Sequence, residues 1–268
     1  MTDDPTPAEG AADTQGTTRG PVSRTGEPVP ALLLLPNLVT MTAMCLGLTS
    51  IRFVFAERFE IALVLLILAA VLDGLDGLIA RRLRATSDFG AELDSLSDFL
   101  CFGVAPGLLI YRFSLSSADG GLASLGWVFV LVYVCCACLR LARFNVARDE
   151  PTPDGVKHFT GVPSPAGAML ALFPAFLAQA GVVDLSAAPM LVALWLGIVG
   201  ALMISRIPTF SPKAMKVPRA WSRWSLLLTA VVVGMLFTRF WLFFVVADLL
   251  YLAGLLQAVR ARRGRDLI

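Results

Sequence analysis

Long apolar runs, interrupted by short polar links, dominate the chain from residue 36 onward. Each run has about twenty residues, the length that an α-helix needs to cross a bilayer. The runs are continuous and do not alternate between apolar and polar positions, so a membrane β-barrel is not expected. The pattern predicts an all-α, polytopic membrane bundle of about eight transmembrane helices, over residues 36–56, 60–82, 92–115, 123–146, 165–184, 189–207, 222–238 and 240–259.

The N-terminal segment has a different composition from the rest of the chain. Thr, Pro, Gly, Asp, Glu and Ala dominate it, and it lacks the short apolar core of a cleavable signal peptide. Such a segment cannot bury enough apolar surface to fold by itself. We therefore expect three regions: a disordered cytoplasmic arm (1–30), a transmembrane domain (31–260) and a basic tail (261–268).

Positive charges fall unevenly on the links between the predicted helices. Of the 22 Lys and Arg residues, 16 lie in alternate links and the tail, on one side of the predicted bundle. Positively charged links stay in the cytoplasm. The chain is thus expected to be an integral protein of a bacterial-type cytoplasmic membrane, with both termini inside. With 57% hydrophobic and only 16% charged residues, it is not a soluble domain, and no nucleic-acid partner is expected.

Four aspartates lie at membrane depth on this basic side. Asp73 and Asp76 end the second predicted helix, and Asp94 and Asp98 begin the third. Spacings of three and four residues place each pair on one helix face, and the short link makes the two helices neighbours. An ionised carboxylate in a membrane is costly unless it is paired or bound to a cation. Because carboxylates bind Mg²⁺ and Mn²⁺ well, the four acids predict a site for two divalent cations.

Small and basic residues accompany these acids. Gly77 and Ala80 leave room for a nucleotide against the helix, and Arg81 offers a planar cation to phosphate oxygens. Gly90 allows close approach on the facing helix. Two ions held about 4 Å apart stabilise both the attacking and the leaving oxygen of a phosphoryl displacement. The cluster therefore favours phosphoryl-transfer chemistry.

The full motif consists of Asp73, Asp76-Gly77, Ala80-Arg81, Gly90, Asp94 and Asp98. These positions are separated by two, two, eight, three and three residues. This pattern resembles, without a departure, the signature of the CDP-alcohol phosphotransferase family. It covers about a tenth of the chain. The resemblance implies an enzyme of phospholipid synthesis, in which an alcohol attacks a CDP-linked lipid and CMP leaves. It also implies a six-helix catalytic core, two divalent metal ions and a homodimer.

The resemblance also implies residue roles. Asp98 would be the general base that takes the alcohol proton, besides being a metal ligand. The other metal ligands would be Asp73, Asp76 and Asp94. The CDP moiety would be held by Asp76, Gly77, Ala80 and Arg81.

Three further residues are candidates for the nucleotide site. Gly90 belongs to the motif, and Asn37 and Thr40 lie one turn apart at the start of the first predicted helix. Asn37 and Thr40 either help to begin that helix or face the aspartates. The sequence leaves both interpretations open.

Residues 140–145, 159–165 and 205–213 are similar to the phosphatidylserine synthase branch of this family. That similarity implies transfer of the phosphatidyl group from CDP-diacylglycerol to L-serine. The serine carboxylate needs a cation or a helix N-terminus as its partner, and Ser164 is expected to cap a helix that begins at Pro165. Candidate acceptor-binding residues on the basic side are Arg140, Arg143, Asn145 and Ser164, although a positive-inside helix end would also explain the two arginines.

Other interpretations remain. Glycerol 3-phosphate or inositol phosphate as acceptor would need a denser basic pocket, to which Arg206 and Lys213 could contribute. A divalent-cation transporter would also carry acids in the membrane, but these acids cluster at one edge with no second tier toward the other face. Asp248, late in the last apolar run, has no assigned role. The sequence does not select between Mg²⁺ and Mn²⁺.

Overall fold

A computed structural model describes residues 34–83, 87–116, 121–149, 161–205 and 222–263. Within these ranges the backbone is helical and contains no strand. The predicted N-terminal arm, and Arg206 and Lys213, lie outside the described residues, as does the tail beyond residue 263. The limits of the three predicted regions therefore stay predictions.

Eight helical rods follow one another along the described chain, which confirms the predicted all-α bundle. The third rod, Asp88–Leu115, is one continuous helix with two wider π-helical turns. Pro36 stands in the first turn of α1, where its missing N–H costs no hydrogen bond. The rods are α1 (Leu35–Phe55), α2 (Phe59–Leu83), α3 (Asp88–Asp98) with η2 (Phe99–Val104), α4 (Ala105–Ile110) and η3 (Tyr111–Leu115), α5 (Gly121–Asp149), α6 (Ser164–Gln179), α7 (Pro189–Ile204), α8 (Ser222–Thr238) and α9 (Phe240–Arg263).

Five of these rods are long and apolar enough to cross a membrane, namely α1, α2, the rod Asp88–Leu115, α5 and α9. The other three, α6, α7 and α8, are shorter apolar helices. Because α6 ends at Gln179, it stops several residues before the end of the predicted span 165–184. The chain is an integral membrane protein.

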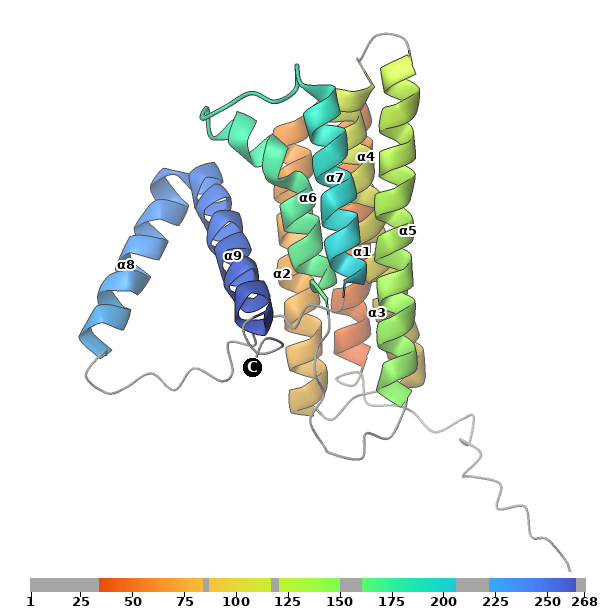
Figure 1. Ribbon diagram of the computed structural model, residues 1–268. Helices are drawn as coiled ribbons and strands as arrows, with labels where there is room; N and C mark the ends of the chain where they lie inside the picture. Colours follow the sequence, from red (N-terminus) through yellow and green to blue (C-terminus); the bar gives the residue numbers. More distant parts are fainter. Residues whose placement is uncertain (1–33, 84–86, 117–120, 150–160, 206–221, 264–268) are drawn as a thin grey trace, which may run out of the picture.

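Helices α1 to α7 form one upright bundle, and the α8–α9 hairpin leans against its side (Figure 1). Within the bundle α1 packs along α2, and α5 packs along α7. Helix α9 packs on α6, where Phe176 stacks on Trp241 and Phe244 with ring centroids 6.2 and 5.3 Å away. These aromatic contacts hold α9 against the bundle.

A buried tyrosine of α5 forms a hydrogen bond to the irregular third rod. Tyr133 of α5 is fully buried, and its hydroxyl donates to the carbonyl of Phe102 over 2.7 Å. Phe102 lies in the π-helical turn η2. A buried hydroxyl needs a partner, and this bond ties α5 to the rod that carries Asp94 and Asp98.

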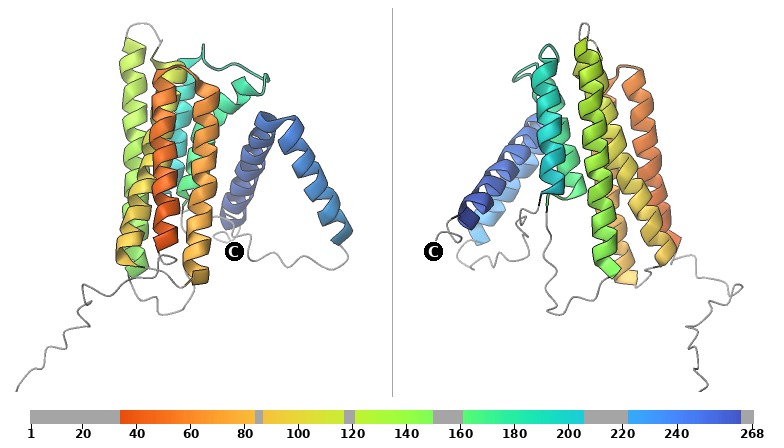
Figure 2. Two further views of the ribbon diagram at one scale, coloured as in Figure 1. Left: turned by 180° about the vertical axis from the view of Figure 1, so that it is seen from behind. Right: turned by 45° about the vertical axis from the view of Figure 1, so that its right-hand side comes forward.

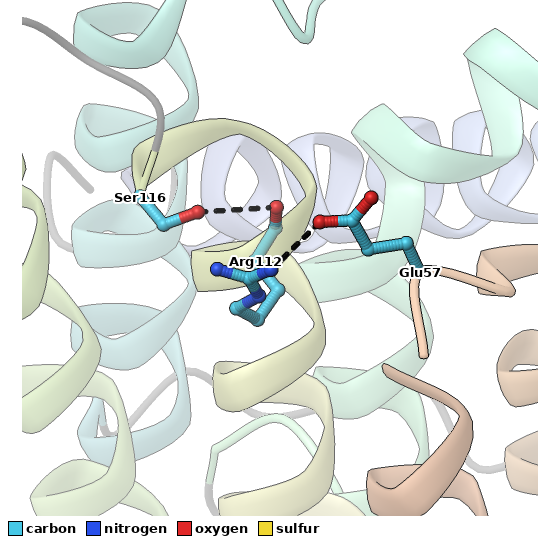
Figure 3. Close-up of polar contacts among 3 residues, drawn as sticks. All are labelled: Glu57, Arg112 and Ser116. Atoms are coloured by element: carbon cyan, nitrogen blue, oxygen red, sulfur yellow. Dashed lines mark hydrogen bonds and ion pairs between the residues drawn. The ribbon is translucent and has the colours of Figure 1, made fainter. Parts of the chain in front are cut away.

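The turn between α1 and α2 marks the end of the bundle away from the aspartates. There Arg112 of the third rod donates to Glu57 over 2.8 Å, and the hydroxyl of Ser116 donates to the Arg112 carbonyl (Figure 3). An exposed ion pair of this kind adds little stability, but it fixes which elements meet at this end. Arg81 and Arg82 lie in the last turn of α2, at the opposite end of the bundle. They therefore share the end of the bundle that contains the aspartates.

Candidate active site

Three of the four motif aspartates converge in the structure. One carboxylate oxygen from each of Asp73, Asp76 and Asp94 lies within 4.8 Å of the other two, the arrangement of a site that could hold a metal ion. The surrounding packing differs from the expected side-by-side pair. Helix α1 packs against both α2 and α3, whereas α2 and α3 make little direct contact (Figure 2, left). The carboxylates meet across the space that this separation leaves.

Asp98 lies one helical turn further along α3 and completes the acidic group. Its side chain is within hydrogen-bonding reach of Asp73, and it interacts electrostatically with Asp94. Its Oδ1 atom is buried without a hydrogen-bond partner in the described part of the chain. Two carboxylates in contact need a shared proton or a cation between them. The set of donors and the unpartnered oxygen therefore fit a hard divalent cation.

Thr40 faces the aspartates, which decides between the two interpretations of its role. Its hydroxyl donates to Oδ2 of Asp76 over 2.6 Å, and Asp76 is the most buried of the four acids, with 5% of its surface exposed. Ser97 of α3 donates to the Thr40 carbonyl over 3.4 Å. Helix α1 thus supports the acidic site by hydrogen bonds to both α2 and α3.

Gly90 allows another helix to approach closely, as expected, but that helix is α1. A Cβ atom at Gly90 would lie 2.8 Å from Oδ1 of Asn37 and 3.1 Å from Oγ of Ser87. Ser87 caps α3 by accepting a hydrogen bond from the Gly90 N–H over 3.0 Å. The glycine therefore lets the start of α3 lie against the Asn37 side chain.

Arg81 lies beside Gly77 on α2. Its terminal nitrogens are 3.7 and 3.9 Å from the position that a Gly77 Cβ would take. Ala80 is half-buried and Arg81 is exposed. This places a guanidinium one turn beyond Asp76, where it is free to contact a phosphate group.

Arg140 connects the acidic group to the start of α6. It is half-buried on α5, interacts electrostatically with Asp98, and donates a hydrogen bond to the Ser164 hydroxyl. The prediction that Ser164 caps α6 is wrong. Pro163 occupies the capping position and Ser164 is the first helical residue, because its hydroxyl is engaged by Arg140 instead of by the helix backbone.

The other two predicted acceptor residues contact helices nearby. Arg143 is exposed and donates to the carbonyl of Ile204 over 3.0 Å, at the end of α7. The Asn145 amide donates to the hydroxyl of Ser95 on α3 over 3.0 Å. Of the four candidates, the structure brings Arg140 close to Asp98 and Ser164 into contact with Arg140, while Arg143 and Asn145 tie α5 to α7 and α3.

Two polar residues near the site were not singled out in the sequence. Ser97 is buried between α1 and α3, and Tyr251 of α9 interacts electrostatically with Arg140. For Tyr251 the sequence did contain a signal, because it lies three residues after Asp248 and so shares a helix face with that acid.

The fold and the site together define a polytopic membrane protein with an aspartate cluster that could hold a metal ion. Residues 33–204 match the family model for CDP-alcohol phosphatidyltransferase. The chain belongs to this family.

Similar proteins come from several bacteria, and each is named CDP-diacylglycerol–serine O-phosphatidyltransferase. The protein of Mycobacterium tuberculosis (strain H37Rv) is 35% identical over 234 residues, which cover 87% of this chain and 80% of the relative. That of Mycobacterium leprae is 39% identical over 189 residues, or 70% of this chain and 61% of the relative. That of Helicobacter pylori (strain 26695) is 38% identical over 143 residues, or 53% and 57%.

Proposed function

We propose that this chain transfers the phosphatidyl group from CDP-diacylglycerol to the hydroxyl of L-serine, giving phosphatidylserine and CMP. The observation that carries the proposal is its similarity to proteins with this activity in their name, over 87% of the chain. The site supports it, because Arg140 lies between the acidic group and the start of α6. A guanidinium in this position suits the carboxylate of an amino acid.

The reaction is a displacement at phosphorus. The serine hydroxyl oxygen bonds to the phosphorus that carries diacylglycerol, the bond from that phosphorus to the CMP oxygen breaks, and CMP leaves with the electron pair. Asp98 takes the hydroxyl proton. Its unpartnered Oδ1 is available to a hydroxyl group, and a general base must lie within hydrogen-bonding reach of the proton that it removes.

We propose that the four aspartates hold two divalent cations, Mg²⁺ or Mn²⁺. Bound ions would neutralise charge on the pyrophosphate bridge and on the attacking and leaving oxygens. Thr40 fixes one oxygen of Asp76 by its hydrogen bond, so that carboxylate keeps one orientation. Partners of this kind, which orient a ligand without binding the ion, support metal affinity. The metal ligands would be Asp73, Asp76, Asp94 and Asp98.

The CDP moiety would lie over the small residues of α2. Gly77 and Ala80 provide space, and Arg81 is placed to meet a phosphate oxygen. Gly90 and Asn37 shape the same region where α3 meets α1. Asp76, held by Thr40, would contact the nucleotide from the end of the acidic group.

For the acceptor, Arg140 and Ser164 are the primary binding residues in this proposal. Arg143 and Asn145 lie further along α5, and their present hydrogen bonds leave them a supporting role in the same end of the bundle. A glycerol 3-phosphate or inositol phosphate acceptor would need more positive charge around its dianionic phosphate. Among the described residues of the site, Arg140 is the half-buried cation beside Asp98.

We further propose that the aspartate end faces the cytoplasm and that the enzyme is a homodimer. Arg81, Arg82, Arg140 and Arg143 lie toward the aspartate end of their helices, which agrees with the positive-inside rule. The dimer is proposed from the family resemblance. Crosslinking in native membranes would test the homodimer. Labelling of single cysteines by a membrane-impermeant reagent would test which end of the bundle faces the cytoplasm.

The decisive experiment offers the purified protein CDP-diacylglycerol with labelled serine, glycerol 3-phosphate or inositol phosphate in parallel. The expected result is CMP release and a labelled lipid with serine only. A labelled lipid formed from another acceptor, and not from serine, would replace serine in the proposal. Divalent-cation flux into vesicles without any CMP release would favour a transporter instead.

A further inference from the structure

Buried polar atoms without hydrogen-bond partners occur both in the active site and on α9. In the described part of the chain, five buried side-chain atoms have no hydrogen-bond partner. One of them, Nε of Arg112, is at the far end of the bundle. The other four are on α3, α5 and α9: Asp98 Oδ1, Arg140 Nε, Asp248 Oδ2 and Tyr251 Oη. Buried polar groups normally have a partner. Because Tyr251 interacts electrostatically with Arg140, the unpartnered atoms of α9 are linked to the acceptor side of the site and point to a polar ligand.

Helix α9 carries two of these atoms and lies outside the family match, which ends at residue 204. Its face toward the bundle contains Phe244, Val245 and Leu255, packed against the core. Asp248 and Tyr251 share a helix face at a spacing of three residues. Asp248 is 6% exposed, and the interaction of Tyr251 with Arg140 shows that this face reaches the acceptor end of the site.

An acid on this apolar face needs a physical reason. A carboxylate buried in a membrane bundle is costly without a cation, and Asp248 has no protein hydrogen bond to its Oδ2. A cationic ligand group would supply the missing partner. An acceptor phosphate would be repelled by the acid, whereas an amino acid carries an ammonium group within a few bonds of its carboxylate.

We propose that α9 supplies the ammonium-binding half of the acceptor pocket. Asp248 accepts hydrogen bonds from the α-ammonium group, Arg140 binds the α-carboxylate, and Tyr251 lies between them with its hydroxyl available to the acceptor. This inference rests on the proposed transfer to serine and adds the residues that select an amino acid over other alcohols. The acceptor class is therefore a zwitterionic amino alcohol with a free carboxylate.

The test compares serine with hydroxypropionate, its amine-free analogue, in which the hydroxyl and the carboxylate are at opposite ends of the same three-carbon chain. In the wild-type enzyme, this analogue should have a KM higher than that of serine by roughly tenfold to a hundredfold, the value of a hydrogen bond to a charged group. The variant Asp248→Asn should raise the serine KM by about the same factor. It should leave the KM values of the amine-free analogue and of CDP-diacylglycerol unchanged. Tyr251→Phe should raise the serine KM less.

Asp184→Asn is the matched control. Asp184 is exposed on the link between α6 and α7, where it accepts a hydrogen bond from the Ser186 N–H over 2.9 Å. The serine KM of the Asp184→Asn variant should equal that of the wild type.

The possible failures are distinguishable. If the wild-type enzyme transfers serine but Asp248→Asn keeps the wild-type KM, or raises both acceptor KM values equally, this inference is rejected alone. If Asp248→Asn does not fold, equal wild-type KM values for serine and its amine-free analogue reject it. If the wild-type enzyme does not use serine at all, the proposed function fails and this inference fails with it.

Discussion

Thr40 and Asp76 join the first two helices at the centre of the site. The Thr40 hydroxyl donates to Asp76 Oδ2 over 2.6 Å, and both side chains are buried. The bond orients a carboxylate that has one oxygen within 4.8 Å of oxygens of Asp73 and Asp94. A residue on α1 thus sets the orientation of a ligand on α2, although α1 itself contributes no acid.

Thr40→Val should therefore weaken metal binding without unfolding the protein. Valine keeps the shape of threonine but cannot donate the hydrogen bond, and loss of such a supporting bond costs about tenfold or more in metal affinity. The measurement is the Mg²⁺ or Mn²⁺ concentration that gives half-maximal activity. Thr42→Val is the control, because the exposed Thr42 hydroxyl bonds only the Leu38 carbonyl of its own helix. Equal metal dependence in both variants would contradict this role of Thr40.

Asp98→Asn should reduce turnover by a factor of about 10² to 10⁴, the contribution of a positioned general base. The amide keeps the size of the carboxylate but cannot take the hydroxyl proton. CMP release measures turnover, and binding of CDP-diacylglycerol, which should persist, is measured on the same preparation. Asp184→Asn serves again as an exposed control. Near wild-type turnover in Asp98→Asn would remove Asp98 from the role of base.

Removal of divalent cations should stop the reaction. The acidic group has a high density of negative charge, and its carboxylates suit Mg²⁺ and Mn²⁺. Activity should fall to background in excess EDTA and return when either ion is added back. Binding of Mn²⁺, followed by its paramagnetic resonance signal, should fall in Asp94→Asn. Full activity after thorough chelation would contradict a metal-dependent mechanism.

Gly90→Ala should loosen the contact of α3 with α1. The added methyl group would lie 2.8 Å from Asn37 Oδ1, and overpacking of this kind destabilises by about 1–3 kcal/mol. The thermal melting temperature in detergent should fall, and activity should fall with it.

Gly254→Ala is the matched control, because a Cβ at this exposed position of α9 meets no atom within 4 Å. It should be neutral or slightly stabilising, since alanine favours a helix by up to about 1 kcal/mol over glycine. Adding Asn37→Ala to Gly90→Ala should restore part of the lost stability by removing the clash. The steric account would be contradicted if Asn37→Ala gave no rescue. It would also be contradicted if Gly90→Ala and Gly254→Ala had equal effects on the melting temperature.

Arg140→Ala and Arg143→Ala should differ, although the two arginines are three residues apart. Arg140 is half-buried beside Asp98, so its loss should raise the serine KM by roughly tenfold to a hundredfold. Arg143 is exposed and bonds the Ile204 carbonyl, so we expect a smaller increase. The KM is measured with CDP-diacylglycerol saturating. An unchanged serine KM for Arg143→Ala would remove Arg143 from the acceptor site, and an unchanged value for Arg140→Ala would remove Arg140.

Some features of the site could be predicted from the sequence because they depend on local geometry. The spacings Asp73 to Asp76 and Asp94 to Asp98 put each pair on one face of any α-helix. The length and continuity of the apolar runs determine that the backbone forms membrane helices, since no other satisfied backbone conformation fits a single apolar segment. These relations hold whatever the neighbouring helices are.

Other features depended on which helices are neighbours. The short link predicts α2 beside α3, but α1 packs against both, and that arrangement gives Thr40 its bond to Asp76. The sequence pattern assigns Arg140 and Arg143 the same role, while the structure turns one toward Asp98 and the other toward α7. Ser164 is expected from its position to cap α6, and it accepts a hydrogen bond from Arg140 instead.

The sequence by itself determined the membrane helices, the acidic motif and the chemistry that four carboxylates favour. Only the tertiary structure decided that Thr40 supports Asp76, that Arg140 lies between Asp98 and Ser164, and that α9 brings Tyr251 to the same place. The physical reason is that helix periodicity fixes positions over a few residues, whereas contacts between residues on different helices depend on how all the helices pack.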